Sequence, residues 1–250
     1  MASDLEQAGS WLARHGLASA SPTPLLAVRL AARRRARLAS SVLLGTFILA
    51  IALISTTGAG PLLLTATVIA LVAALALLDG WVRRVDRRAG ATLLRRAAHP
   101  VQLGWRTVLG LPRAVFAVAT FTAAAVLAAS GLTVDDPDGR DAAVVLLIGW
   151  CGVAIGMCVQ LRHLLTHPAV ADDEVPLTAD AVMRVEDARE VAAPTALWSL
   201  PVVSLLNNTP GWWTVAWLTF VVLGALTLIL INLRTAASGT VARHAMSGGR

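Results

Sequence analysis

Lysine and tyrosine are absent from the sequence, and all 21 basic residues are arginine. Without lysine the chain has no Schiff-base lysine, no lysine general base and no phosphate-binding lysine of a P-loop. We therefore expect that the chain does not hydrolyse ATP by itself. Alanine and arginine are abundant instead, which is typical of proteins from GC-rich bacteria, so we expect a bacterial source.

Cysteine is scarce as well. The two cysteines, Cys151 and Cys158, lie seven residues apart in one apolar run. On a helix this spacing places them on roughly one face and about 10 Å apart along the axis, which is too far for a disulfide. A zinc site needs more ligands than two. We interpret both as small apolar residues of a helix.

Charged residues make up 14% of the 250 residues, whereas a soluble domain carries about 25%. The chain contains six apolar runs without Asp, Glu, His, Lys or Arg: 39–56, 61–78, 114–132, 142–161, 191–206 and 213–233. A membrane-spanning helix needs roughly 20 residues, within a range of about 17 to 25. The sequence therefore predicts an all-α, polytopic membrane protein with six transmembrane helices arranged as three hairpins.

The fifth run, 191–206, is short and contains Pro194 and Pro201. It fits either a kinked span that borrows residues from its flanks or a re-entrant segment. We favour a span, because a re-entrant segment would leave the two ends of the chain on opposite sides of the membrane.

The arginines indicate the orientation. With both termini in the cytosol, the inner segments hold 6 arginines before residue 39, 8 in 79–113, 3 in 162–190 and 3 after 233, which leaves only Arg140 outside. Cytosolic loops are enriched in basic residues in this way. We expect an N-terminal segment 1–38 at the inner surface of a bacterial cytoplasmic membrane, a membrane domain 39–233 and a cytosolic tail 234–250.

Amphipathic helices are expected at the cytosolic surface. The first follows a capping-box pattern, Ser3-Asp4-Leu5-Glu6, and stops near Gly16; a loosely ordered tail is the alternative. A second, interfacial helix opens at Pro24 and leads into the first span. It carries five arginines: Arg29, Arg33, Arg34, Arg35 and Arg37.

A third helix is expected over 178–190. Thr178 is in position to cap it, and Val182, Val185 and Ala188 recur at helical spacing, so they mark its inner face.

Small residues predict where the spans pack, since lipid gives no hydrophobic drive between helices. Gly149, Gly152 and Gly156 form one seam in 142–161. A second seam contains Ala66, Ala70 and Ala74. Whether the glycine seam packs inside the chain or against a second copy is open at this point, so a homodimer is one alternative. The lack of ionisable residues inside the runs argues against a proton- or ion-coupled carrier.

The outer loop is rich in aspartate, at positions 135, 136, 138 and 141. Asp135, Asp138 and Gly139 match the spacing of the metal-binding motif of CDP-alcohol phosphotransferases, but the positions of the two later aspartates hold Gly156 and Gln160. A magnesium site would lack its ligands there. We interpret the loop as a polar turn with Asp141 capping the next helix, and we predict no enzymatic activity, no metal and no cofactor.

The segment 80–113 contains the stretch from Arg88 to Val101, RAGATLLRRAAHPV, and a later Leu109-Gly110. This resembles the cytosolic loop of ABC-2-type exporter permeases, in which Gly-Thr-Leu precedes a short helix, Pro-Val and a later Leu-Gly. The chain length and the six apolar runs are also similar. The resemblance implies a permease subunit that pairs with a second six-span subunit and docks on a separate ATP-binding subunit. The residues that would make this contact are Arg88, Thr92, Arg95, Arg96, Pro100, Val101, Trp105 and Arg106.

Two further interpretations of this arginine-rich loop stay open. It fits a basic surface that membrane lipids hold through their anionic headgroups, and it fits a non-transporting membrane scaffold that recruits partners. Nucleic acid is not expected as a partner, because the arginines flank the apolar runs and no aromatic groove accompanies them.

Overall fold

A computed structural model of the chain describes residues 2–18, 20–58, 60–91, 104–166, 174–207, 209–235 and 238–241. Every regular element in these residues is a helix, as the sequence predicts. In chain order the helices are α1 (Ala2–Arg14), α2 (Pro24–Thr57), α3 (Pro61–Ala91), α4 (Trp105–Val108), α5 (Leu111–Gly131), α6 (Pro137–Thr166), α7 (Glu174–Val191), α8 (Thr195–Ser199), α9 (Val202–Leu206) and α10 (Gly211–Arg234).

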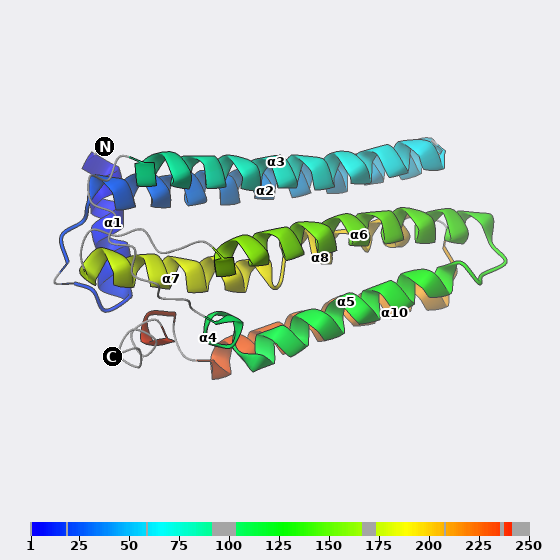
Figure 1. Ribbon diagram of the computed structural model, residues 1–250. Helices are drawn as coiled ribbons and strands as arrows, with labels where there is room; N and C mark the ends of the chain where they lie inside the picture. The colour runs from blue at the N-terminus through cyan, green and yellow to red at the C-terminus, as the bar shows by residue number, and fades with distance from the viewer. Residues whose placement is uncertain are drawn as a thin grey trace.

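The long helices lie side by side in an elongated bundle (Figure 1). Helices α1, α4 and α7 gather at one end, which we call the arginine-rich end. The last described residues, 238–241, reach the same end: a Cβ atom on Gly239 would lie 2.7 Å from the carbonyl oxygen of His15. The turns after α2, α5 and α9 lie at the opposite end, which we call the acidic end.

Five helices of the described chain, α2, α3, α5, α6 and α10, are long and apolar enough to cross a membrane. The remaining apolar run, 191–206, forms the two short helices α8 and α9. They are separated at Pro201, which has no backbone N–H to continue the hydrogen-bond ladder. Leu200 and Val203 of this run are fully buried, and α9 contacts α2, α6 and α10. The interrupted segment therefore lies at the centre of the bundle.

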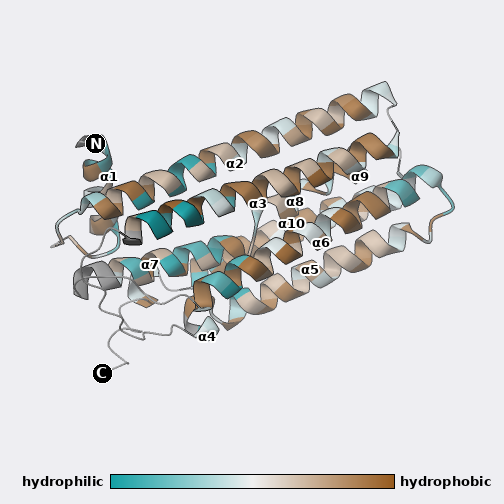
Figure 2. Cartoon of the chain, turned by 45° about the horizontal axis from the view of Figure 1, so that its top comes forward, coloured by the Kyte–Doolittle hydropathy of each residue, from teal (hydrophilic) through white to brown (hydrophobic). Residues whose placement is uncertain are grey.

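Helix α2 confirms that Pro24 opens a helix that carries the five arginines into the first apolar run. The interfacial part and the first span are not separate elements, because Pro24–Thr57 is one helix of 34 residues. Thr23 caps it by accepting a hydrogen bond from the backbone nitrogen of Leu26 at 3.2 Å, and Gly58 ends it with φ of 63°. Its basic first part extends the apolar part without a break, and the polar end of α3 does the same (Figure 2).

Other helix ends differ in detail from the expectation. Helix α1 begins at Ala2, so Ser3 does not cap it, whereas Gly16 has φ of 75° and lies just after the helix, as expected for a stop. Helix α7 begins at Glu174 rather than at a Thr178 cap. Helix α6 begins at Pro137, so Asp141 lies inside it; Asp136 is the cap, and its Oδ2 accepts from the Gly139 nitrogen at 2.9 Å.

The glycines of α6 have different surroundings. A Cβ atom on Gly152 would lie 2.7 Å from Cγ1 of Val72 on α3, and one on Gly149 would lie 2.9 Å from Cγ1 of Val68. Gly156 has open space where its Cβ would be. Close approach between α3 and α6 inside the chain therefore depends on Gly149 and Gly152. The three alanines of α3 lie elsewhere on that helix: Ala66 and Ala70 are exposed and Ala74 is half-buried.

We predict that Gly152→Ala destabilises the bundle, whereas Gly156→Ala leaves its stability unchanged or slightly raised. The added methyl group at 152 overlaps a stiff valine on α3, and overpacking of this kind costs about 1–3 kcal/mol. Thermal unfolding of both detergent-purified variants measures the difference. Equal melting temperatures would contradict the packing described for Gly152.

Candidate functional site

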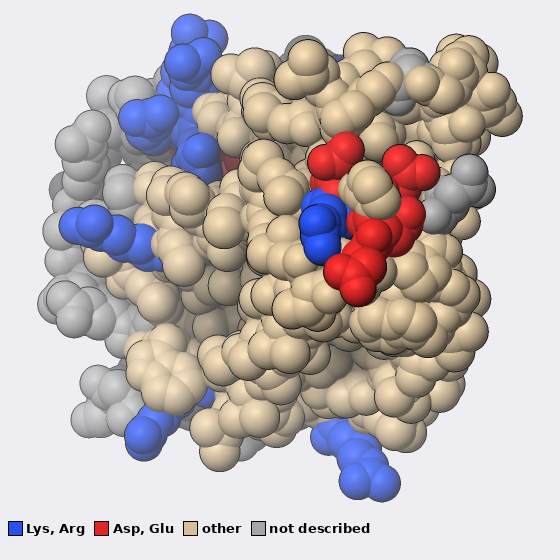
Figure 3. Space-filling view, turned by 90° about the vertical axis from the view of Figure 1, so that its right-hand side faces the viewer, with Lys and Arg blue, Asp and Glu red and all other residues tan. Residues whose placement is uncertain are grey.

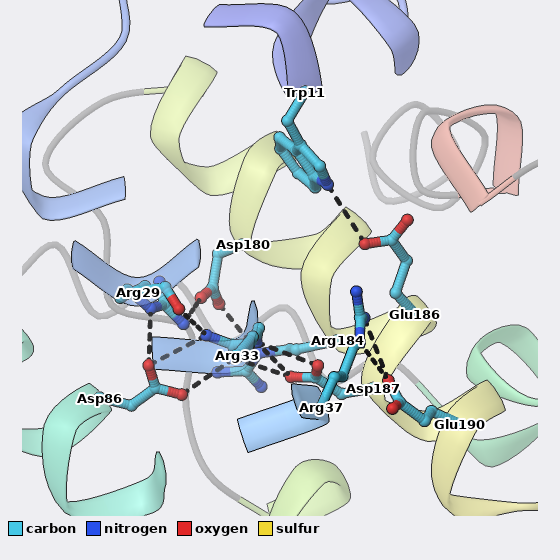
Figure 4. Close-up of polar contacts among 10 residues, drawn as sticks. All are labelled: Trp11, Arg29, Arg33, Arg37, Asp86, Asp180, Arg184, Glu186, Asp187 and Glu190. Carbon is cyan, nitrogen blue, oxygen red and sulfur yellow. Dashed lines mark hydrogen bonds and ion pairs between the residues drawn. The ribbon is translucent and has the colours of Figure 1, made fainter. Parts of the chain in front are cut away.

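A buried network of charged residues joins α2, α3 and α7 at the arginine-rich end (Figure 4). We call it the ion network. Its members come from the first part of α2, the last part of α3 and the middle of α7. They are Arg29, Arg33, Asp86, Asp180, Arg184 and Asp187.

Arg33 is the centre of the ion network. Its Nη2 lies 2.7 Å from Oδ2 of Asp187 on α7 and 2.9 Å from Oδ2 of Asp86 on α3. Its Nε donates to Oδ1 of Asp187 at 3.0 Å. The guanidinium therefore makes forked contacts with two carboxylates, an arrangement that fixes orientation and is stronger than a single neutral hydrogen bond. One side chain thus ties α3 and α7 to α2.

Arg29, one turn earlier, makes the second link. Its Nη2 donates to Oδ1 of Asp180 at 2.7 Å and its Nε to Oδ1 of Asp86 at 3.2 Å. Asp180 also accepts from Nε of Arg184 at 2.9 Å. The Asp180 side chain is only 4% exposed, so both of its arginine partners are needed to replace the water that it loses on burial.

The ion network holds three arginines and three aspartates, so its formal charges cancel. This balance is the condition under which charges can be buried without a large desolvation penalty. At the rim, Nη2 of Arg37 lies 3.0 Å from Oε2 of Glu190, but both side chains are more than half exposed, at 55% and 54%. This outer pair adds little to stability, because water and salt screen it.

Helix α1 covers the ion network from outside. Its Ala8, Trp11 and Leu12 pack against residues of α2 and α7. Trp11 donates through Nε1 to Oε2 of Glu186 on α7 at 3.3 Å, and His15 Nε2 lies 2.8 Å from Oε1 of the same carboxylate. The arginine-rich end is therefore a packed layer of four helices, not a set of separate surface helices.

The residues expected to contact a partner are only partly described. Thr92, Arg95, Arg96, Pro100 and Val101 lie outside the described residues.

The other three expected contact residues are exposed at the arginine-rich end: Arg88 on α3, and Trp105 and Arg106 on α4. The Arg106 guanidinium lies 5.3 Å from the Trp105 ring centroid, within cation–π range. Behind them, Val108 and Leu109 pack against Ala188 and Ala192 of the α7 segment. Helix α4 therefore presents a polar aromatic face to solvent and an apolar face to α7.

The sequence does not predict the ion network. It predicts an interfacial helix that carries the arginines of α2, and for α7 it predicts only the apolar face, whose Val182, Val185 and Ala188 are indeed fully buried. The spacing of the charged residues does indicate which of them share a helix face. Arg29 and Arg33 are four residues apart, and Asp180, Arg184 and Asp187 recur at four and three, so each set shares one helix face.

The acidic end shows a different chemistry. Figure 3 shows carboxylates gathered around one arginine there. Arg140 donates through Nε to the carbonyl oxygen of Val134 at 2.7 Å, and its Nη2 lies 3.3 Å from Oδ1 of Asp135. In the described chain no group of three or more His, Cys, Asp or Glu side chains is arranged to hold a metal ion. Cys151 and Cys158 are free thiols on an exposed face of α6.

Comparison of the chain with family models, curated protein sequences and solved structures found no match.

We predict that Arg33→Gln strongly destabilises the arginine-rich end, whereas Arg37→Gln does not. Loss of Arg33 leaves two half-buried carboxylates without their main partner, at a cost of about 3–5 kcal/mol. The exposed Arg37 pair contributes about 1 kcal/mol or less. Hydrogen–deuterium exchange of α7 is the direct measurement, and faster exchange is expected in Arg33→Gln only. Similar exchange in the two variants would show that the ion network does not hold α7.

Proposed function

We propose that the chain is the membrane-spanning permease subunit of an ABC-type exporter, coupled to a separate ATPase through the 80–113 loop. The observation that carries this proposal is the continuous contact from the end of that loop to the centre of the bundle. Helix α4 packs on α7, and α7 continues through Pro194 into the interrupted segment α8–α9.

The first step of this route is apolar. Val108 and Leu109, at 2% and 8% exposed, lie against Ala188 and Ala192. A partner that pushes on α4 therefore pushes directly on the end of α7. Because Arg33 ties α7 to α2 and α3, these three helices are expected to move as one unit.

The second step passes into the interrupted segment. Pro194 and Pro201 remove backbone hydrogen bonds from it, while α2, α6 and α10 surround it. Interrupted helices in the middle of a bundle are common in transporters, where they change shape between states. The segment is therefore the part of the bundle that we expect to respond to motion of α7.

The exposed face of the loop suits a protein partner. Arg88, Trp105 and Arg106 are exposed at the arginine-rich end, and arginine and tryptophan are enriched in protein interfaces. The chain itself has no lysine for nucleotide binding, so a separate ATP-binding subunit would supply the nucleotide chemistry. Pairing of two copies belongs to the same proposal.

We further infer six crossings with both termini in the cytosol of a bacterial cell. The start of α10, which follows the interrupted segment, lies at the acidic end, since a Cβ atom on Gly139 would lie 3.5 Å from Pro210 and one on Gly131 would lie 2.6 Å from Trp213. The end of α7 with α8 and α9 would then be the fifth crossing. The bias of arginine toward one end supports the orientation.

Thiol labelling tests this orientation. In a background with Cys151 and Cys158 changed to serine, we expect a membrane-impermeant maleimide to label Arg140→Cys in intact cells. Arg35→Cys should react only after the membrane is opened, because it lies at the arginine-rich end. Labelling of both positions, or of residue 35 alone, would contradict the proposed topology.

Co-purification tests the exporter proposal. The tagged chain, solubilised gently from its native host, is expected to bring down a near-stoichiometric protein that contains G-x-x-x-x-G-K-[ST] and hydrolyses ATP. The yield of that protein should fall severalfold in Arg95→Glu and Trp105→Ala and stay unchanged in Arg140→Gln at the acidic end. The chain recovered alone would overturn the proposal.

A second candidate is a non-transporting membrane scaffold. The observation that favours it is the set of exposed arginines at one end, where Arg84, Arg87 and Arg88 lie on α3 without a carboxylate partner in the described part of the chain. The same co-purification separates the two candidates, because a stoichiometric partner without a nucleotide site would support the scaffold.

A further inference from the structure

Arg113, at the start of α5, is a buried arginine whose charge is not balanced by the described part of the chain. The residue is 6% exposed. Its Nη2 donates to Oδ1 of Asn232 on α10 at 2.6 Å, while its Nη1 is buried and has no hydrogen-bond partner. The amide oxygen of Asn232 is neutral, so it accepts a hydrogen bond but cannot cancel the positive charge.

Arg33 shows what a buried arginine normally requires in this protein. Its side chain is 11% exposed and contacts two aspartates. An arginine that is buried without a counter-charge costs several kcal/mol. Arg113 is therefore expected to recruit an anion from its surroundings.

A second arginine lies near Arg113. Arg189 on α7 is close enough to repel it. Burial also lowers the pKa of the Arg189 guanidinium from its ordinary value, against the opposing effect of Glu186.

The start of α5 adds a further positive field. Gly110, with φ of 74°, precedes this helix of 21 residues, and no side chain caps it. Pro112 has no N–H and Ala114 already donates to Gly110, so the backbone N–H groups of Leu111 and Arg113 are those that favour an anion at this terminus.

The position of Arg113 indicates where the anion comes from. Arg113 directly precedes the apolar run 114–132, so it lies at headgroup depth if α5 crosses the membrane. On one side it adjoins the apolar cluster of Val108, Leu109 and Ala117. On the other side Leu111 is 63% exposed and Asn232 is exposed as well. If α5 crosses the membrane, these exposed neighbours of Arg113 lie at the boundary between membrane and cytosol.

We propose that Arg113 and the N-terminus of α5 bind a phosphate group at the inner membrane surface. Phosphate carries several acceptor oxygens on one centre, so it can accept from Nη1 and from the backbone of α5 at the same time. Phosphate groups of anionic lipids are concentrated at this depth, and basic sites between helices on the cytosolic side bind them. The site does not depend on an ATPase partner and goes beyond the exporter proposal.

Two substitutions test the site in delipidated protein purified in dodecyl maltoside. Arg113→Gln removes the unbalanced charge, and Asn232→Asp supplies a carboxylate beside it. Both variants are expected to melt at the same temperature as the wild type or higher in detergent alone. Addition of dioleoylphosphatidylglycerol should then stabilise the wild type but neither variant, with binding about tenfold weaker in Arg113→Gln.

Arg234→Gln is the matched control, since Arg234 is an exposed arginine at the same end of α10. The lipid should raise its melting temperature as much as that of the wild type. This result separates a specific site from general attraction to a basic surface. The proposal is overturned if phosphatidylglycerol and phosphate raise the melting temperatures of Arg113→Gln and Asn232→Asp as much as that of the wild type. Both variants could instead melt below the wild type in every condition, with the same rise on addition of lipid. That result would assign Arg113 a structural role and would also overturn the proposal.

Two further additions identify the source of the phosphate. Dioleoylglycerol has the same chains without phosphate and is expected to have no effect. Sodium phosphate is compared with sodium chloride at equal ionic strength. Stabilisation by sodium phosphate as large as that by phosphatidylglycerol assigns the site to free phosphate, whereas stabilisation by the lipid alone assigns it to a headgroup. An equal effect of dioleoylglycerol would overturn the phosphate proposal.

Discussion

The arrangement of the arginine-rich end depends on one guanidinium held between two carboxylates. Arg33 contacts Asp86 on α3 and Asp187 on α7, so one side chain links both helices to α2. The charges cancel within six side chains, which permits their burial. Helix α1 then packs over the layer through apolar contacts. The polar end is therefore held by ion pairs and apolar contacts together.

The apolar bundle is organised by a different constraint, the fit of small residues against an interrupted helix. Gly149 and Gly152 let α6 approach α3, and a Cβ atom on Gly149 would also meet Leu200 at 3.0 Å. Trp150 and Trp217 stack beside this centre with ring centroids 6.3 Å apart. Both of their buried Nε1 donors lack a hydrogen-bond partner. The side chains at this centre thus pack closely, but two buried donors have no hydrogen-bond partner in the described chain. Unpaired donors of this kind are uncommon in a buried core.

Much of this fold could be predicted from local sequence patterns. The five long spans follow from apolar runs, the stop at Gly16 from glycine, and the buried face with Val182 and Val185 from helical spacing. The ion network could not be predicted in the same way, because Arg33 and Asp187 are 154 residues apart and no local period connects them. The predictions of the helix caps were wrong for a related reason. Asp136 and Asp141 both suit a cap chemically, and only the three-dimensional path of the loop decides between them.

The separation between Arg33 and Asp187 also determines the order of assembly. During synthesis at about 5–20 residues per second, the 154 residues between them take about 8–30 s to produce. Over that interval α2 is complete and its arginines have no aspartates of α7 to bind. Asp86 on α3, 53 residues after Arg33, is the carboxylate of the ion network that is available earlier. Closure of the arginine-rich end by α7 is consequently a late step of biogenesis, in which Asp187 joins Asp86 at the Arg33 guanidinium.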